Sequence, residues 1–90
     1  MTPQEAYRIV KRRYPSCFAS SCLEYDKFYL FSMIPYKFFG ATSYVAGSVF
    51  DAVDKKTGKV TSYDILTDVE AYHNAKPHKV EDRILSLIGS

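Results

Sequence analysis

The chain has 90 residues, of which 47% are apolar and 24% charged, with only four Gly and four Pro. This balance is typical of a folded soluble domain and excludes a disordered, collagen-like or coiled-coil chain. Twelve basic side chains stand against ten acidic ones, so the chain lacks the strongly acidic surface of a DNA mimic. A chain this short forms one domain with little room for a deep substrate cavity. Its unusual feature is its aromatic content, eight Tyr and six Phe.

An amphipathic helix is predicted at the start of the chain. Thr2 and Glu5 have the spacing of a capping box, and Pro3 lies at the first helical position, where its missing N–H costs nothing. An apolar stripe follows at helical spacing, made by Ala6, Ile9, Val10 and Tyr14. The basic residues at 11–13 occupy the last turn, where the helix dipole favours cations, and Pro15 ends the helix.

The middle of the chain predicts an antiparallel sheet of about four strands. The predicted strands are residues 17–25, 28–34, 44–53 and 60–66. Between the last two, Asp54 begins a hairpin turn and Gly58 supplies a positive φ before the return strand. Residues 36–43 fit neither a strand nor a helix pattern.

Two short helices are predicted after the sheet. Thr67 and Glu70 repeat the spacing of a capping box, which predicts a helix to about Ala75, and Pro77 then interrupts it. The apolar residues of a last amphipathic helix are Val80, Ile84, Leu87 and Ile88, with Gly89 as its cap. The sequence therefore predicts a single α+β domain over residues 1–90: an N-terminal helix packed on an antiparallel sheet of about four strands, followed by one or two short C-terminal helices.

Residues that commonly carry catalysis or bind metals are sparse. Cys17 and Cys22 lie roughly 16 Å apart on one straight strand, beyond disulfide reach unless a turn intervenes, so free thiols are expected. His73 and His78 lie on either side of Pro77 and match no metal-ligand spacing. No nucleophile has a catalytic signature around it. The sequence thus predicts a protein that is not an enzyme and that has no cofactor and no metal.

Basic side chains gather in the N-terminal helix. Residues 1–15 contain four of them and a single acidic side chain, Glu5. One interpretation is a solvated helix end whose cations complement the helix dipole. The other is a secondary electrostatic contact with an anionic partner, made by Arg8, Arg12 and Arg13.

Aromatic residues are concentrated in the centre of the chain, with nine of the fourteen in residues 25–50. A domain of this size cannot surround all of them. Tyr36, Phe38 and Phe39 fall where regular structure is interrupted. These rings either fold back as a lid on the sheet, or form an exposed patch for a partner protein. In the second case the three rings are the anchors and Lys37 lies at the rim.

Two stretches resemble known small bacterial domains. Residues 2–6, TPQEA, open an amphipathic helix, and residues 50–60, FDAVDKKTGKV, form a hairpin. In these stretches the chain is similar to PepSY domains, to YrhB-like immunity domains and to small proteins encoded in prophages of Gram-positive bacteria. The resemblance implies an α+β module that binds proteins, as a peptidase inhibitor in one family and in immunity to toxins in the other. The segment at 35–43 and the C-terminal helices depart from both families, and the resemblance implies no catalytic residues.

The predicted function is a non-enzymatic protein-binding module of bacterial, phage or prophage origin. It would act as an inhibitor or accessory factor by occupying a surface of a partner protein. One alternative is a small structural or assembly protein, in a virion or a homo-oligomer. The other is a single-stranded nucleic-acid binder with a basic and aromatic face. The chain opens without the basic-then-apolar pattern of a signal peptide and has no apolar run near ~20 residues, so we expect a cytoplasmic protein without a membrane partner.

Overall fold

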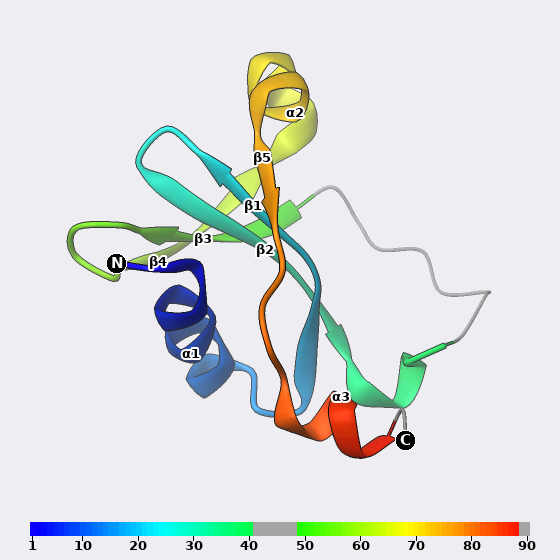
Figure 1. The fold of residues 1–90 in the computed structure, drawn as a ribbon. Helices are drawn as coiled ribbons and strands as arrows, with labels where there is room; N and C mark the ends of the chain where they lie inside the picture. Colours follow the sequence, from blue (N-terminus) through cyan, green and yellow to red (C-terminus); the bar gives the residue numbers. More distant parts are fainter. Residues whose placement is uncertain (41–48, 89–90) are drawn as a thin grey trace.

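A computed structural model of the chain describes residues 1–40 and 49–88 (Figure 1). The elements follow in the order α1 (Pro3–Arg13), β1 (Cys17–Tyr25), β2 (Phe28–Pro35), η1 (Tyr36–Phe38), β3 (Val49–Asp54), β4 (Val60–Asp64), η2 (Ile65–Thr67), α2 (Val69–Asn74), β5 (Lys76–His78) and α3 (Arg83–Ile88). The strands form one sheet in the order β4-β3-β2-β1-β5, and every neighbouring pair is antiparallel. The predicted α+β fold is confirmed.

Helix α1 begins at the predicted capping box. The Thr2 hydroxyl accepts the Glu5 amide at 3.2 Å, and the Glu5 carboxylate accepts the Thr2 amide at 3.1 Å. Both bonds satisfy amides that the first helical turn leaves without backbone partners. The pKa of the Glu5 carboxyl is lowered, chiefly because the carboxylate accepts the hydrogen bond of the Thr2 amide. The helix ends at Arg13, before Pro15, as predicted.

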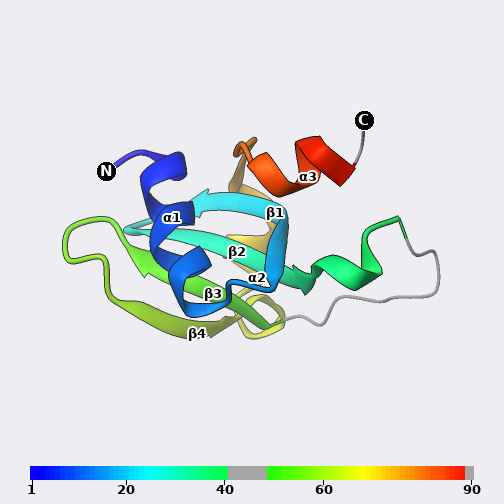
Figure 2. The same ribbon diagram turned by 90° about the horizontal axis from the view of Figure 1, so that it is seen from below.

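The core lies between α1 and one face of the sheet (Figure 2). Three α1 side chains are buried there, those of Ala6, Tyr7 and Val10. The sheet contributes alternate residues, which point to the same face because side chains in a strand alternate. These residues are Cys22 on β1, Tyr29 and Phe31 on β2, and Val53 on β3. Phe31 and Val53 are fully buried, so β2 and β3 form the centre of the core.

The C-terminal part departs from the prediction in two ways. Residues Lys76–His78 form a fifth strand beside β1, with Cys22 opposite His78. The helix predicted around Val80 begins only at Arg83, so Val80 lies in the segment between strand and helix. Pro77 lies in an edge strand, where a residue without an N–H is tolerated. The Glu24 carboxylate also contacts Nε2 of His78 at 2.7 Å, which helps to hold this short strand on β1.

Other boundaries shift by a few residues. Strand β4 ends at Asp64, because the chain turns there into η2 and the Asp64 carboxylate accepts the Leu66 amide at 3.0 Å. Helix α2 is capped by Asp68 and not by Thr67. The described part of the third strand begins at Val49, so the predicted positions 44–48 lie outside the described residues, as does the predicted cap Gly89.

The hairpin between β3 and β4 forms as predicted. Gly58 has a φ of +75°, the left-handed conformation that glycine adopts without strain. The Asp54 carboxylate accepts the amides of Lys56 at 2.8 Å and Thr57 at 3.0 Å. A β-carbon at position 58 would lie 3.2 Å from Cδ1 of Ile9, so the turn also packs closely against α1.

Candidate binding surface

Asp82 joins three distant parts of the chain at one end of the molecule. One carboxylate oxygen, Oδ1, accepts the amides of Ile84 at 2.9 Å and Leu85 at 3.2 Å, which caps α3. The other, Oδ2, accepts the hydroxyl of Tyr36 at 2.6 Å and that of Tyr7. Because Tyr7 belongs to α1 and Tyr36 to η1, this half-buried carboxylate ties both elements to the start of α3.

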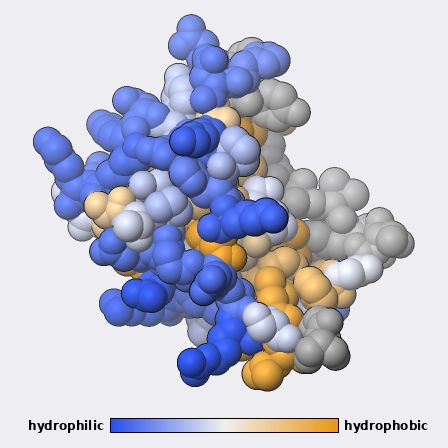
Figure 3. Space-filling view, viewed as in Figure 1, coloured by the Kyte–Doolittle hydropathy of each residue, from blue (hydrophilic) through white to orange (hydrophobic). Residues whose placement is uncertain are grey.

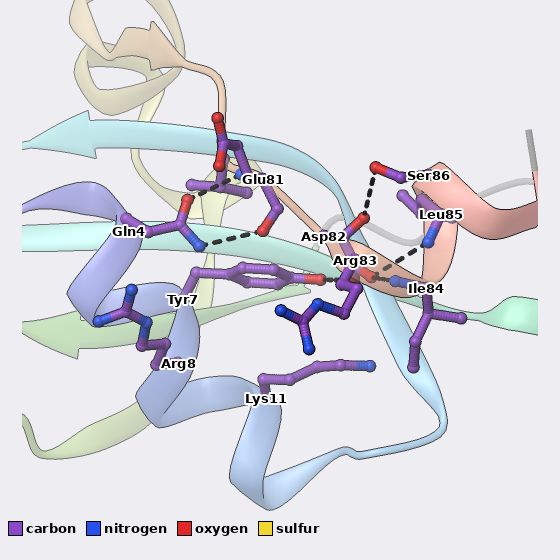
Figure 4. A pocket seen from close by; sticks show the side chains of 11 residues that line it. Gln4, Tyr7, Arg8, Lys11, Glu81, Asp82, Arg83, Ile84, Leu85 and Ser86 are labelled. Carbon is purple, nitrogen blue, oxygen red and sulfur yellow. Dashed lines mark hydrogen bonds between the residues drawn. The ribbon is translucent and has the colours of Figure 1, made fainter.

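A second contact holds the same segment against α1. The Gln4 side chain donates from Nε2 to the carbonyl of Glu81 at 3.0 Å and accepts the Glu81 amide on Oε1 at 2.7 Å. A side-chain amide that pairs both ways with one backbone unit fixes the position and the direction of that unit. This pairing therefore holds the segment between β5 and α3 against α1 (Figure 4).

These contacts shift the ionisation of the groups involved. Burial alone would raise the pKa of Asp82, but the hydrogen bonds from Tyr36, Tyr7 and two amides outweigh it and hold the pKa below its ordinary value. Burial and the bond to Asp82 raise the pKa of both tyrosines far above the usual range. At neutral pH the site therefore holds an ionised carboxylate with two neutral phenols as donors.

A groove of about 1060 Å³ lies between α1 and this segment. One wall is formed by α1 side chains, namely Gln4, Tyr7, Arg8 and Lys11, and the other by residues 80–86. Arg8 and Lys11 enter from α1 and Arg83 from α3, so three cationic side chains come together around the groove (Figure 4).

The three cations differ in their partners. The Lys11 ammonium donates to the carbonyls of Pro15, at 3.0 Å, and of Cys17, and lies 3.9 Å from the centre of the Tyr36 ring. Burial lowers the pKa of Lys11. Arg8 and Arg83 are exposed, and within the described residues neither forms an ion pair. Lys11 thus supports the local structure, whereas the two arginines are available to a ligand.

In the predicted aromatic site one ring folds inward and another is exposed, so each expected outcome holds for part of it. Tyr36 folds inward: its hydroxyl donates to Asp82, and the centres of its ring and the Phe18 ring are 5.7 Å apart. Phe39 meets the same Phe18 ring edge-on, also at 5.7 Å, but remains 43% exposed. Lys37 is exposed and its ammonium lies 5.2 Å from the Phe38 ring. The segment is therefore anchored by Tyr36 and presents Phe39 to solvent. The predicted positions 41–43 lie outside the described residues.

Further apolar side chains are exposed at this end. Ile84 is 42% and Leu87 73% exposed, on α3. Figure 3 shows hydrophobic surface gathered around α3, whereas most of the remaining described surface on this face is hydrophilic. We call the surface formed by Arg8, Phe39, Arg83, Ile84 and Leu87 the docking end.

The predicted basic contact is only partly in this surface. Arg8 lines the groove, whereas Arg12 and Arg13 are exposed and are not among its lining residues. Gln4, Asp82 and Arg83 were not predicted as site residues from the sequence. A signal for Asp82 was present, because an aspartate just before an apolar helical pattern is a typical N-cap.

Other reactive groups give no second site in the described part of the chain. Cys17 and Cys22 are both free thiols, as predicted. Burial raises the pKa of Cys22 to about 11, so at neutral pH this thiol stays protonated and is a poor nucleophile. The described residues contain no group of three or more His, Cys, Asp or Glu side chains that could hold a metal. None of the described helices combines the length and apolar character needed to cross a membrane.

Comparisons with known proteins do not place the chain in a family. No family model matches it, and no curated protein and no solved structure is significantly similar to it. The resemblance of residues 2–6 and 50–60 to PepSY and YrhB-like domains therefore stays a prediction.

Proposed function

We propose that this protein is a non-enzymatic protein-binding module that attaches to a partner protein through the docking end. It acts as an inhibitor or accessory factor by covering a surface of that partner. A bacterial, phage or prophage origin is the part of the proposal that depends only on the resemblance of residues 2–6 and 50–60.

The observation that carries the proposal is the coincidence of exposed apolar side chains with a groove lined by cations. Phe39, Ile84 and Leu87 are exposed at one end of the molecule, beside the groove that Arg8 and Arg83 line. Protein interfaces typically combine apolar and aromatic anchors with a polar or charged rim, and arginine is enriched in them. Exposed apolar surface of this kind lowers the free energy of a complex when a partner removes it from water.

The proposal is tested by affinity capture with two matched double variants. Phe39→Ser with Ile84→Ser removes two anchors of the docking end. Val49→Ser with Leu66→Ser removes two apolar side chains that are 59% and 70% exposed elsewhere. A captured protein is identified by mass spectrometry, purified and titrated against each variant, and circular dichroism melts confirm that each variant is folded.

We expect the partner to bind the wild type and the control variant with similar affinity, and the docking-end variant at least about tenfold more weakly. A partner that binds the docking-end variant normally, or that loses affinity equally for both variants, would contradict the proposal.

A further inference from the structure

We propose that the groove between α1 and α3 binds an acidic peptide segment of the partner. Its carboxylates pair with Arg8 and Arg83, and its apolar side chains pack on Ile84 and Leu85. This inference rests on the proposed function and names the chemistry of the partner.

The charge of the groove favours an anionic ligand. Arg8 and Arg83 form no ion pair within the described residues, in contrast to Lys55, whose ammonium is paired with Glu24. A guanidinium can pair with a carboxylate through two parallel hydrogen bonds, which gives direction as well as attraction. The two arginines enter from opposite walls, so a ligand lying in the groove can meet both (Figure 4).

The two carboxylates of the groove offset its positive charge only in part. Arg8, Lys11 and Arg83 line it against Glu81 and Asp82, and the ionised Asp82 already accepts four hydrogen bonds, from two tyrosines and two amides. The Glu81 side chain is exposed and its carboxylate points away from Arg8 and Lys11 (Figure 4). Cations therefore outnumber carboxylates in the lining, and the two arginines that form no ion pair within the described residues are the charged groups available to a ligand.

The remaining lining favours a peptide over a nucleic acid. Binders of single strands stack bases on exposed aromatic faces, but the aromatic residue of the groove, Tyr7, is only 3% exposed. The opposite wall offers aliphatic side chains instead, Val80, Ile84 and Leu85. A ligand that matches both walls carries acidic and aliphatic side chains together.

The dimensions also suit a peptide. A volume of about 1060 Å³ lies just above the range of small-molecule pockets, roughly 300–1,000 Å³. The helix wall from Gln4 to Lys11 is about 10 Å long at 1.5 Å per residue. An extended peptide advances about 3.3 Å per residue, so about three residues contact this wall.

The probe for the test is a six-residue peptide of alternating Glu and Leu with blocked ends, titrated into the isotope-labelled chain and followed by NMR. We expect saturable shifts of the amides at 4–11 and 80–86, which weaken as salt is added. Shifts centred on the basic hairpin at 55–59, or no shift at millimolar peptide, would overturn the inference. A Gln–Leu peptide of the same length that binds equally well would also overturn it.

Two charge variants separate the groove from general electrostatic attraction. Arg8→Gln with Arg83→Gln removes the two groove arginines, and Arg12→Gln with Arg13→Gln removes two exposed arginines of the same helix that do not line the groove. We expect the dissociation constant for the Glu–Leu peptide to rise about tenfold in the first variant and less than about twofold in the second. Equal loss in both variants would overturn the inference, as would tighter binding of a six-nucleotide oligothymidylate.

The outcome is distinguishable from failure of the proposed function. A captured partner that needs Phe39 and Ile84 but binds the Arg8 and Arg83 variant normally would overturn the acidic-peptide inference alone. A partner insensitive to both sets of substitutions would overturn the proposed function as well.

Discussion

Helices α2 and α3 begin with the same local arrangement but are connected differently to the rest of the molecule. Each starts at an aspartate that caps the first turn and also accepts a tyrosine hydroxyl. Asp68 accepts from Tyr63 at 2.5 Å, only five residues away. Asp82 accepts from Tyr36 and Tyr7, which are 46 and 75 residues away. The capping motif is thus local at α2, whereas at α3 it joins both ends of the chain.

The consequence is that the candidate groove depends on Asp82. Its two walls, α1 and residues 80–86, are joined by Tyr7 to Asp82 and by Gln4 to Glu81. If Asp82 no longer accepted the hydrogen bonds of the two tyrosine hydroxyls, residues 80–86 would be held against α1 mainly by the contact between Gln4 and Glu81. The comparison between Asp82 and Asp68 can therefore be tested by substitutions at each site.

The largest effect is expected for Asp82→Ala. The substitution removes the cap of α3 and leaves the half-buried hydroxyls of Tyr7 and Tyr36 without their acceptor. We expect the free energy of unfolding to fall by about 3 kcal/mol, measured by urea denaturation. Asp68→Ala is the matched control and should shift the urea midpoint by less than half as much. Equal shifts would show that Asp82 has only a local role.

The next effect is expected for the tyrosine hydroxyls. Tyr7→Phe and Tyr36→Phe keep the rings and remove one donor each, so each should lower the free energy of unfolding by about 1–2 kcal/mol. The double variant should cost more than the sum, because both hydroxyls donate to Oδ2 of Asp82 and after either single substitution the other hydroxyl still satisfies that oxygen. Tyr63→Phe is the control at the local site. Strict additivity in the double-mutant cycle would contradict a shared acceptor.

Acid should weaken the structure through Asp82. Its folded-state pKa lies below its ordinary value, so its contribution to stability is present above about pH 4 and is lost as the pH falls through the folded-state pKa. Asp82→Asn cannot ionise, and its unfolding midpoint should fall less steeply below pH 4 than that of the wild type. Parallel pH profiles would show that Asp82 does not contribute in this way.

A smaller effect, followed by spectroscopy, concerns the order in which the tyrosines ionise. The hydrogen bond to Asp68, aided by burial, raises the pKa of Tyr63 to about 12, and the pKa values of Tyr7 and Tyr36 are raised further. Because the folded-state pKa is raised, the stability that these hydroxyls contribute is fully present below about pH 10 and is lost as the pH rises through the folded-state pKa. In a phenolate absorbance titration, Tyr63→Phe should remove a step near pH 12. A Tyr63 that ionises at its ordinary pKa would contradict the Asp68 bond.

The sequence predicts the parts of the fold that depend on neighbouring residues. The Thr2 cap, the strand at 17–25 and the turn at Gly58 have local signals and form as predicted. The fifth strand does not, because three residues around Pro77 carry no strand pattern and pair with β1 some fifty residues earlier. Helical periodicity did offer one further signal, since Gln4, Tyr7, Arg8 and Lys11 share a helix face.

The candidate site was harder to predict, because its residues come together only in three dimensions. Phe39 is exposed, as expected for a side chain that contacts a partner protein. Tyr36 turns inward, because its hydroxyl donates a hydrogen bond to Asp82. No sequence spacing relates positions 36 and 82. The same reason explains why Arg8, which lines the same groove as Asp82, differs in position from Arg12 and Arg13, which do not line it.

Hydrogen–deuterium exchange of the chain, free and bound to its purified captured partner, tests the docking end most directly. We expect the partner to slow exchange at 4–11, 36–39 and 80–88, and to leave the hairpin at 55–59 and helix α2 unchanged. Protection confined to the hairpin or to α2, with the docking end exchanging as in the free chain, would contradict the docking surface.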